Sequence, residues 1–247
     1  MQGLVTLDFG NSHPHAGLFQ KHQNDWQLMK VCPWNELRIY LGQLALTPDN
    51  SSMVLAEVKA REEELTPHQH AGFLVTRVKD YWRGTKFAGM PVNYARTLGE
   101  DRLIQAFYCF KKLKQNILLI DSGTYLTMDV ITNSGFEGGY IIPGVEKYFS
   151  SFASGEQLKS VELDKNITPF LPHATSEAMR DSYYAFAALA QKLIQDYKIE
   201  KVLLTGGQCA IWTQIFDKLE VSVIVQEEPT LIHWALHYWM TTQIEPL

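Results

Sequence analysis

Two stretches of the sequence decide the fold: Leu4-Val5-Thr6-Leu7-Asp8-Phe9-Gly10-Asn11-Ser12 and Ile117-Leu118-Leu119-Ile120-Asp121-Ser122-Gly123-Thr124. Each is an apolar run typical of a buried strand, and each ends in an aspartate, a glycine and a small hydroxyl or amide residue. Glycine lets the backbone turn tightly and bring its N–H groups close to a phosphate, and the aspartate is suited to hold a cation. Because the pattern opens each half of the chain, we predict a duplicated nucleotide-binding core with ATP between the halves.

The remaining segments repeat one order of strands and helices in both halves. In the first half we expect these elements over residues 3–8, 16–19, 26–31, 35–46, 53–58 and 103–113. In the second half we expect them over 117–121, 127–131, 140–142, 176–197, 201–204, 221–225 and from 229 onward, with Thr175 capping the long helix. This order predicts an α/β protein with two similar lobes, residues 1–112 and 113–247.

The composition is that of an ordinary globular protein, with 46% hydrophobic and 20% charged residues. A formal net charge of −5, without a concentrated basic face, gives no reason to expect a nucleic-acid partner. Cys32, Cys109 and Cys209 are widely spaced, which predicts no disulfide framework and fits a reducing compartment. Neither a signal peptide nor a stretch near the roughly 20 apolar residues of a membrane span is evident, so we expect a cytoplasmic protein without a membrane partner.

The segment Gly99-Glu100-Asp101-Arg102 is the candidate for proton transfer. Phosphoryl transfer needs positioning, charge neutralisation and a residue that orients the nucleophile. Asp101 is suited to accept a proton from an attacking hydroxyl while Arg102 and loop amides hold the substrate. The alternative is that the cluster only caps a helix.

Two further patterns bear on the nucleotide. Thr205-Gly206-Gly207 follows an expected strand, and adjacent glycines let an adenine ring lie against the backbone, although an ordinary turn is the alternative. His13, Pro14 and His15 follow the first turn directly and are placed to line the nucleotide. The histidine pairs predict no zinc site, because no acid or cysteine completes a tetrahedral set.

Taken together, the motifs resemble those of the type III pantothenate kinases, a bacterial family with the actin-like (ribonuclease H-like) fold of ATPases and sugar kinases. The matching stretches are LDFGNS at 7–12, LGEDR at 98–102, IDSGTYLTMDV at 120–130, GFEGGYIIPG at 135–144, TSEAMR at 175–180 and LLTGG at 203–207. They occur in family order and cover nearly the whole chain.

The resemblance implies transfer of the γ-phosphate of ATP to the primary hydroxyl of pantothenate, the first step of coenzyme A synthesis, by a homodimer. It implies that Asp101 is the proton acceptor and that Asp121 binds a monovalent cation, potassium or ammonium. Magnesium would bridge the phosphates, with Asp8 as the nearest acid. Expected ATP contacts are Asp8, Phe9, Gly10, Asn11, Ser12, His13, Pro14, His15, Thr124, Gly206 and Gly207. Expected pantothenate contacts are Tyr94, Gly99, Glu100, Asp101, Arg102 and Thr175.

Three positions depart from the family pattern. Tyr94 lies five residues before Gly99, whereas the family's substrate tyrosine lies seven before the equivalent glycine. Ser182 stands where glycine is frequent, and His13-Pro14-His15 is bulkier than expected after the first turn. Two alternatives therefore stay open: a kinase of this fold acting on another small alcohol, and a catalytically inactive accessory protein that works by binding.

Overall fold

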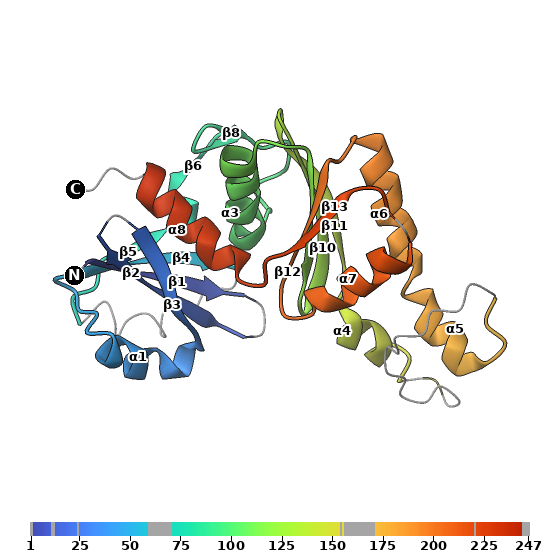
Figure 1. The fold of residues 1–247 in the computed structure, drawn as a ribbon, viewed down its shortest axis with the longest axis horizontal. Coiled ribbons are helices and arrows are strands. Elements are labelled where there is room, and N and C mark those ends of the chain that lie inside the picture. Colours follow the sequence, from blue (N-terminus) through green and yellow to red (C-terminus); the bar gives the residue numbers. More distant parts are fainter. Residues whose placement is uncertain are drawn as a thin grey trace. The chain divides into compact units, whose positions relative to one another are not determined.

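The computed structural model describes residues 2–10, 13–23, 25–58, 71–153, 155, 171–219 and 221–243 (Figure 1). The chain divides into two compact units, one formed by Met1–Lys112 with Leu231–Leu247 and the other by Leu113–Thr230. Each unit is built around its own five-stranded sheet.

The sheet of the first unit has the strand order β3-β2-β1-β4-β5. Its strands are β1 (Gln2–Phe9), β2 (His15–His22), β3 (Asp25–Pro33), β4 (Ser51–Glu57) and β5 (Val75–Arg77). The first three strands form an antiparallel meander, and β4 and β5 add in parallel to β1. The central strand β1 is therefore paired on both edges.

The sheet of the second unit repeats this topology with the order β11-β10-β9-β12-β13. Its strands are β9 (Ile117–Ser122), β10 (Tyr125–Thr132), β11 (Gly135–Pro143), β12 (Lys201–Thr205) and β13 (Ile224–Glu227). As in the first unit, three strands form an antiparallel meander and two add in parallel. The duplicated α/β architecture predicted from the two Asp-x-Gly turns is thereby confirmed.

Helices cover these sheets and complete the two cores. In the first unit they are α1 (Leu37–Gln43), α3 (Glu100–Tyr108) and α8 (Leu231–Gln243). In the second they are α4 (Val145–Ser150), α5 (Thr175–Ser182), α6 (Ala185–Asp196) and α7 (Cys209–Lys218). A small sheet of β6 (Trp82–Arg83), β7 (Lys86–Phe87) and β8 (Met90–Pro91) precedes α3. Among the described residues, we find no helix with the length and apolar character to cross a membrane.

Strand β1 is buried on both faces, and the two faces differ in chemistry. Val5, Leu7 and Phe9 point toward α1 and belong to one apolar core. Thr6 and Asp8 alternate with them and lie on the opposite face, where α8 packs. The same strand therefore anchors an apolar core on one side and presents polar groups on the other.

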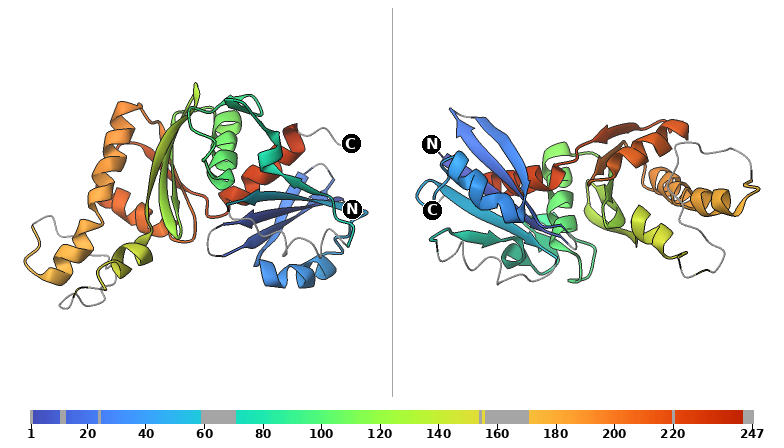
Figure 2. Two further views of the ribbon diagram at one scale, coloured as in Figure 1. Left: turned by 180° about the vertical axis from the view of Figure 1, so that it is seen from behind. Right: turned by 90° about the horizontal axis from the view of Figure 1, so that it is seen from below.

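The final helix α8 differs from the sequence-based division, which placed residues 113–247 in the second lobe. It packs against α3, β1 and β4 of the first unit (Figures 1 and 2). Trp234 contacts Phe19 of β2 edge-on at 5.1 Å between ring centroids, and His237 stacks on Phe19 at 4.6 Å. Because α8 is apolar on several sides, it fills the space between the sheet and α3.

The long helix expected over 176–197 is divided into α5 and α6, and the expected cap is also different. Ala174, and not Thr175, occupies the N-cap position of α5. At the break, the hydroxyl of Ser182 donates to the carbonyl of Met179 at 2.7 Å and also bonds the hydroxyl of Tyr148 at 2.9 Å. Back-bonding of this kind often bends helices, and the next residue, Tyr183, lies in the core of the second unit.

Strand β4 and helix α3 are joined by a buried pair of carboxylates. The backbone N–H of Glu57 donates to Glu100 Oε2 at 3.2 Å. Arg77 Nη1 and Lys79 Nζ each lie 3.2 Å from Glu57 Oε2. Burial raises the pKa of Glu100 to about 7, while the Glu57 N–H and the Lys79 charge act in the opposite direction. This cluster fixes the start of α3 against the end of β4.

We expect Glu100→Gln to stabilise the protein at pH 8 and to leave its stability nearly unchanged at pH 5. The pKa of Glu100 is raised from 4.5 to about 7 on folding, so the folded state holds this proton more tightly than the unfolded state. The resulting loss of stability develops as pH rises from about 4.5 to 7 and is complete above it. Glutamine still accepts from Glu57 N–H but cannot ionise. Urea unfolding should show a gain on the order of 1–3 kcal/mol at pH 8.

A matched control is Glu146→Gln, which removes an exposed carboxylate from α4 of the other unit. This control should not change the difference in stability between pH 5 and pH 8. An equal loss of stability in Glu100→Gln at both pH values would contradict the assignment of a buried, hard-to-ionise carboxyl.

Candidate functional site

The first Asp-x-Gly turn begins at the carboxyl end of β1. Asp8 is largely buried, with 14% of its side chain exposed. Phe9 lies in the apolar core and meets Trp34 edge-on at 4.8 Å between ring centroids, so its side chain points away from the turn. Gly10 follows as the half-buried start of the turn. Asn11 and Ser12, which were expected to contact phosphate, lie outside the described residues.

His15 faces Asp8 because the two residues are direct partners in the antiparallel pairing of β1 with β2. Residues opposite each other in such a pair have their side chains on the same face. His15 Nε2 lies 3.4 Å from Asp8 Oδ2. Burial lowers the pKa of His15, and the neighbouring His13 lowers it further. His13 is exposed, and Pro14 uses its carbonyl to accept from Trp34 N–H at 3.0 Å.

A second buried histidine reaches His15 from α8. His233 Nε2 lies 3.0 Å from His15 Nδ1, and His233 Nδ1 lies 2.8 Å from Thr6 Oγ1. Burial holds the pKa of His233 well below its usual value, and His15 contributes in the same direction. The sequence had no signal for this contact, because His233 and Thr6 lie far apart along the chain. Sequence reasoning missed Thr6 and His233, which connect His15 to the interior of the first unit.

The segment from Gly99 to Arg102 lies at the same sheet edge as the first turn. Strands β1 and β4 are parallel, and Phe9 pairs with Glu57 at their carboxyl ends. Since Glu57 N–H bonds Glu100, helix α3 starts at that edge. The carboxyl ends of neighbouring parallel strands are the usual place for ligands in open α/β sheets.

Asp101 lies in the first turn of α3 and is half-buried. A Cβ at Gly99 would overlap the Asp101 carboxylate, so glycine leaves the space that this carboxylate uses. Burial raises the pKa of Asp101, while the Arg102 N–H and the Arg102 charge act in the opposite direction. The carboxylate is therefore a stronger proton acceptor than an exposed aspartate.

The other residues expected to contact pantothenate lie in three different places. The guanidinium of Arg102 lies over the ring of Tyr94, 5.4 Å from its centroid, which brings these two residues together. The Glu100 carboxylate is directed at β4 instead. Thr175 is exposed at the start of α5 in the second unit.

The second Asp-x-Gly turn lies at the carboxyl end of β9 and meets the glycine turn after β12. Thr205 pairs with Asp121, and Gln208 N–H donates to the carbonyl of Ser122 at 2.9 Å. Gly206 has a φ of +84°, and a Cβ there would lie 2.5 Å from Asp121 Oδ1 and 2.6 Å from the carbonyl oxygen of Ser122. Only glycine is compatible with this backbone and this proximity.

Two more predicted residues flank this turn. Thr124 is half-buried, and its carbonyl accepts from Gly144 N–H at 3.2 Å, which ties it to the glycine directly after β11. Gly207 is exposed directly after Gly206. The structure therefore brings Asp121, Thr124 and Gly206 together within the second unit.

Asp8 and Asp121 differ in the ligand atoms that they and their neighbours could offer to a cation. Magnesium is usually held by one or two carboxylates plus substrate phosphates, and Asp8 fits that role. Beside Asp121, Thr127 Oγ1 is buried and, among the described residues, has no hydrogen-bond partner. A hydroxyl and a carboxylate on one face suit a cation that prefers oxygen ligands. Within the described part of the chain, no group of three or more His, Cys, Asp or Glu residues is arranged to hold a metal.

Comparison with solved structures supports the fold. A crystal structure from Campylobacter jejuni, assigned to the Baf family of transcriptional activators, matches with a TM-score of 0.59 and 20% identity, covering 96% of this chain and 97% of that one. A protein from Sinorhizobium meliloti, assigned as a 2-dehydro-3-deoxygalactonokinase, matches with a TM-score of 0.60 and 11% identity over 99% and 100% of the two chains. Together with the two repeated sheets, these similarities confirm the predicted actin-like fold with two similar lobes.

Comparison of sequences identifies the family. Type III pantothenate kinase of Citrifermentans bemidjiense is 23% identical over 228 residues, covering 84% of this chain and 89% of the relative. Type III pantothenate kinase of Desulfosudis oleivorans is 25% identical over 224 residues, covering 83% and 87%. The family model for type III pantothenate kinase matches residues 4–196. The chain therefore belongs to the type III pantothenate kinase family.

Proposed function

We propose that the protein is an ATP-dependent kinase that phosphorylates the primary hydroxyl of pantothenate to 4'-phosphopantothenate. The observation that carries this proposal is the placement of Asp101 at the sheet edge where the first Asp-x-Gly turn begins. One unit would thereby supply both the proposed phosphate-binding turn and the proposed proton acceptor. The repeated turn at Asp121 supports the same reading, as does membership of the family.

ATP is proposed to bind through backbone N–H groups of the two turns. In the first turn these belong to residues 10–12, and in the second Thr124 adds a hydroxyl donor. Gly206 and Gly207 expose backbone against which the adenine ring is proposed to lie. Magnesium, when bound beside Asp8, would neutralise charge on the phosphates.

Asp101 is proposed to accept the proton of the pantothenate hydroxyl as the new P–O bond forms. Its half-buried position at the start of α3 restricts water and makes the carboxylate more basic. Arg102 is proposed to hold the substrate with Tyr94, which it already contacts. As the resemblance implies, the active form is proposed to be a homodimer.

Asp101→Asn should lower kcat by about 10²–10⁴-fold, because an amide cannot accept the proton. The measurement is ADP release in the presence of pantothenate, ATP and magnesium, with thermal unfolding recorded in parallel. The control Asp196→Asn removes a carboxylate of α6 that only pairs with Lys192 on the surface, and it should retain the wild-type rate. A folded Asp101→Asn variant with a near-normal rate would refute the proton-acceptor role.

Replacing potassium by sodium at equal ionic strength should lower turnover by about tenfold or more, equivalent to roughly 1.4 kcal/mol of transition-state stabilisation. The physical reason is that a site beside Asp121 sized for potassium would hold the smaller sodium ion less well, so less positive charge would lie near the phosphates. Asp121→Asn should remove most of this dependence on potassium.

Equal turnover in both salts would discard the potassium site and keep the kinase. A panel of other small alcohols, assayed under the same conditions, tests the substrate. Turnover of another alcohol without turnover of pantothenate would refute pantothenate as the substrate.

A further inference from the structure

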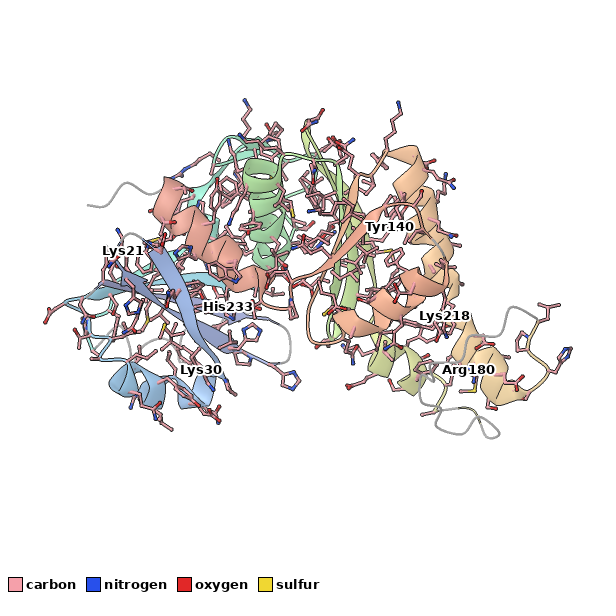
Figure 3. The ribbon with its side chains drawn as sticks, viewed as in Figure 1. Lys21, Lys30, Tyr140, Arg180, Lys218 and His233 are labelled. Carbon is pink, nitrogen blue, oxygen red and sulfur yellow. The ribbon has the colours of Figure 1, made fainter. Side chains whose placement is uncertain are left out.

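Four side chains form a continuous polar path from the interior of the first unit to the first turn. Thr6 Oγ1 lies 3.1 Å from the carbonyl oxygen of Gly17 and 2.8 Å from His233 Nδ1. His233 Nε2 then lies 3.0 Å from His15 Nδ1, and His15 Nε2 lies 3.4 Å from Asp8 Oδ2. Figure 3 labels His233, which extends from α8 toward the first sheet. Each ring nitrogen of the two histidines thus has one neighbour on the path.

The sheet is shaped to admit the ring of His233. A Cβ at Gly17 would lie 2.7 Å from His233 Cγ and Nδ1 and 2.7 Å from Thr6 Oγ1. Such separations are too short for any side chain at position 17. Glycine at position 17 is therefore required for His233 to reach Thr6.

The path has two arrangements of hydrogen atoms that keep both histidine rings neutral. In the first, the Thr6 hydroxyl donates to His233 Nδ1, His233 Nε2–H donates to His15 Nδ1, and His15 Nε2–H points at Asp8.

In the second arrangement every donor is reversed. The Thr6 hydroxyl donates to the Gly17 carbonyl and accepts from His233 Nδ1–H, and His233 Nε2 accepts from His15 Nδ1–H. His15 Nε2 then presents a lone pair beside Asp8 Oδ2, and two such acceptors side by side require a cation between them. The Gly17 carbonyl makes this reversal available, because it gives the Thr6 hydroxyl a second acceptor.

The second arrangement has the form of a metal-binding histidine with its supporting partners. Metal-binding histidines almost always donate their other ring N–H to an orienting acceptor, which here is His233 backed by Thr6. Bonds of about 2.0–2.2 Å to a tetrahedral or octahedral ion place adjacent ligands about 3.0–3.5 Å apart. The separation of 3.4 Å between His15 Nε2 and Asp8 Oδ2 lies in this range.

We propose that His15 Nε2 and Asp8 Oδ2 together bind a divalent cation, and that this mixed nitrogen–oxygen pair favours Mn²⁺ over Mg²⁺. Mn²⁺ takes the same carboxylate and water ligands as Mg²⁺, but as a first-row transition ion it accepts an imidazole nitrogen more readily than Mg²⁺, whose ligands are oxygen atoms. The proposal rests on the proposed function only in placing this cation beside the ATP phosphates, which would complete its coordination. Binding of the ion to the protein itself does not depend on which alcohol is phosphorylated.

The test is Mn²⁺ binding to the full chain, followed by electron paramagnetic resonance with and without ADP. In the wild type we expect three-pulse electron spin-echo modulation from a directly bound ¹⁴N. His15→Gln should abolish this modulation and weaken Mn²⁺ binding about tenfold, with a smaller effect on Mg²⁺ measured by competition. Thr6→Val, which removes only the hydroxyl at the far end of the path, should weaken Mn²⁺ binding severalfold, less than the roughly 10–100-fold typical of a direct supporting partner, because Thr6 acts through His233.

Two control variants identify which histidine is the ligand. His22→Gln removes an exposed histidine from the other end of β2 and should leave the ¹⁴N modulation unchanged. His13→Gln removes the exposed neighbour two residues before His15 and should also leave it unchanged. Loss of the modulation in His13→Gln and its retention in His15→Gln would overturn the assignment.

The outcomes separate this site from the proposed function. Absence of ¹⁴N modulation in a wild-type protein that turns over pantothenate would overturn the metal site and leave the kinase standing. Modulation that depends on His15, in a protein without pantothenate turnover, would support the site and refute the substrate. If His15→Gln fails to fold, the Mn²⁺ affinity of Thr6→Val decides, and an affinity equal to the wild type would overturn the proposal.

Discussion

The pairing of β1 with β2 is the constraint on which the first unit depends. Because β1 is buried on both faces, its register determines which side chains meet α1 and which meet α8. A slip of one residue would send Thr6 and Asp8 into the apolar core and Val5 and Leu7 toward α8. The observed register places Asp8 opposite His15 and Thr6 opposite Gly17, so the polar groups of both strands share one face.

The two units share a topology but differ in the chemistry around their aspartates. Across the equivalent strand pair, Asp8 faces a histidine and Asp121 faces a threonine. A ring nitrogen beside a carboxylate suits a transition ion, whereas a hydroxyl beside a carboxylate suits an ion that prefers oxygen. In each unit the sheet fixes the position of the aspartate, and the cross-strand partner sets which ligand atom lies beside it.

Buried polar groups also connect the segment from Gly99 to Arg102 to the sheet. The Glu100 carboxyl is directed at the Glu57 N–H of β4, which places the next residue, Asp101, at the carboxyl edge of β1 and β4. Burial there raises the pKa of both carboxyl groups, and the consequence differs between them. Glu100 holds the junction between α3 and β4 at a cost in stability above neutral pH, and Asp101 gains basicity at the edge where the first Asp-x-Gly turn begins.

The sequence by itself determined the duplication, the two Asp-x-Gly turns and the family, because apolar runs, glycines and short motifs are local properties of the chain. It also indicated that Gly206 follows a strand and that Asp101 begins a helix. Asn11 and Ser12 remain predictions, and so do the roles of Thr124 and Thr175. Local periodicity also predicted one long helix after 175, but the hydroxyl of Ser182 and the burial of Tyr183 divide it.

Only the tertiary structure decided which elements meet. Periodicity shows that the last helix has apolar faces, but it does not tell which sheet those faces cover, and α8 packs on the first unit. The contact between His233 and His15 follows from that packing, and so does the space that Gly17 leaves for it. The physical reason is that such contacts join residues more than 200 positions apart, whose proximity is set by the packing of whole elements and not by the residues around them.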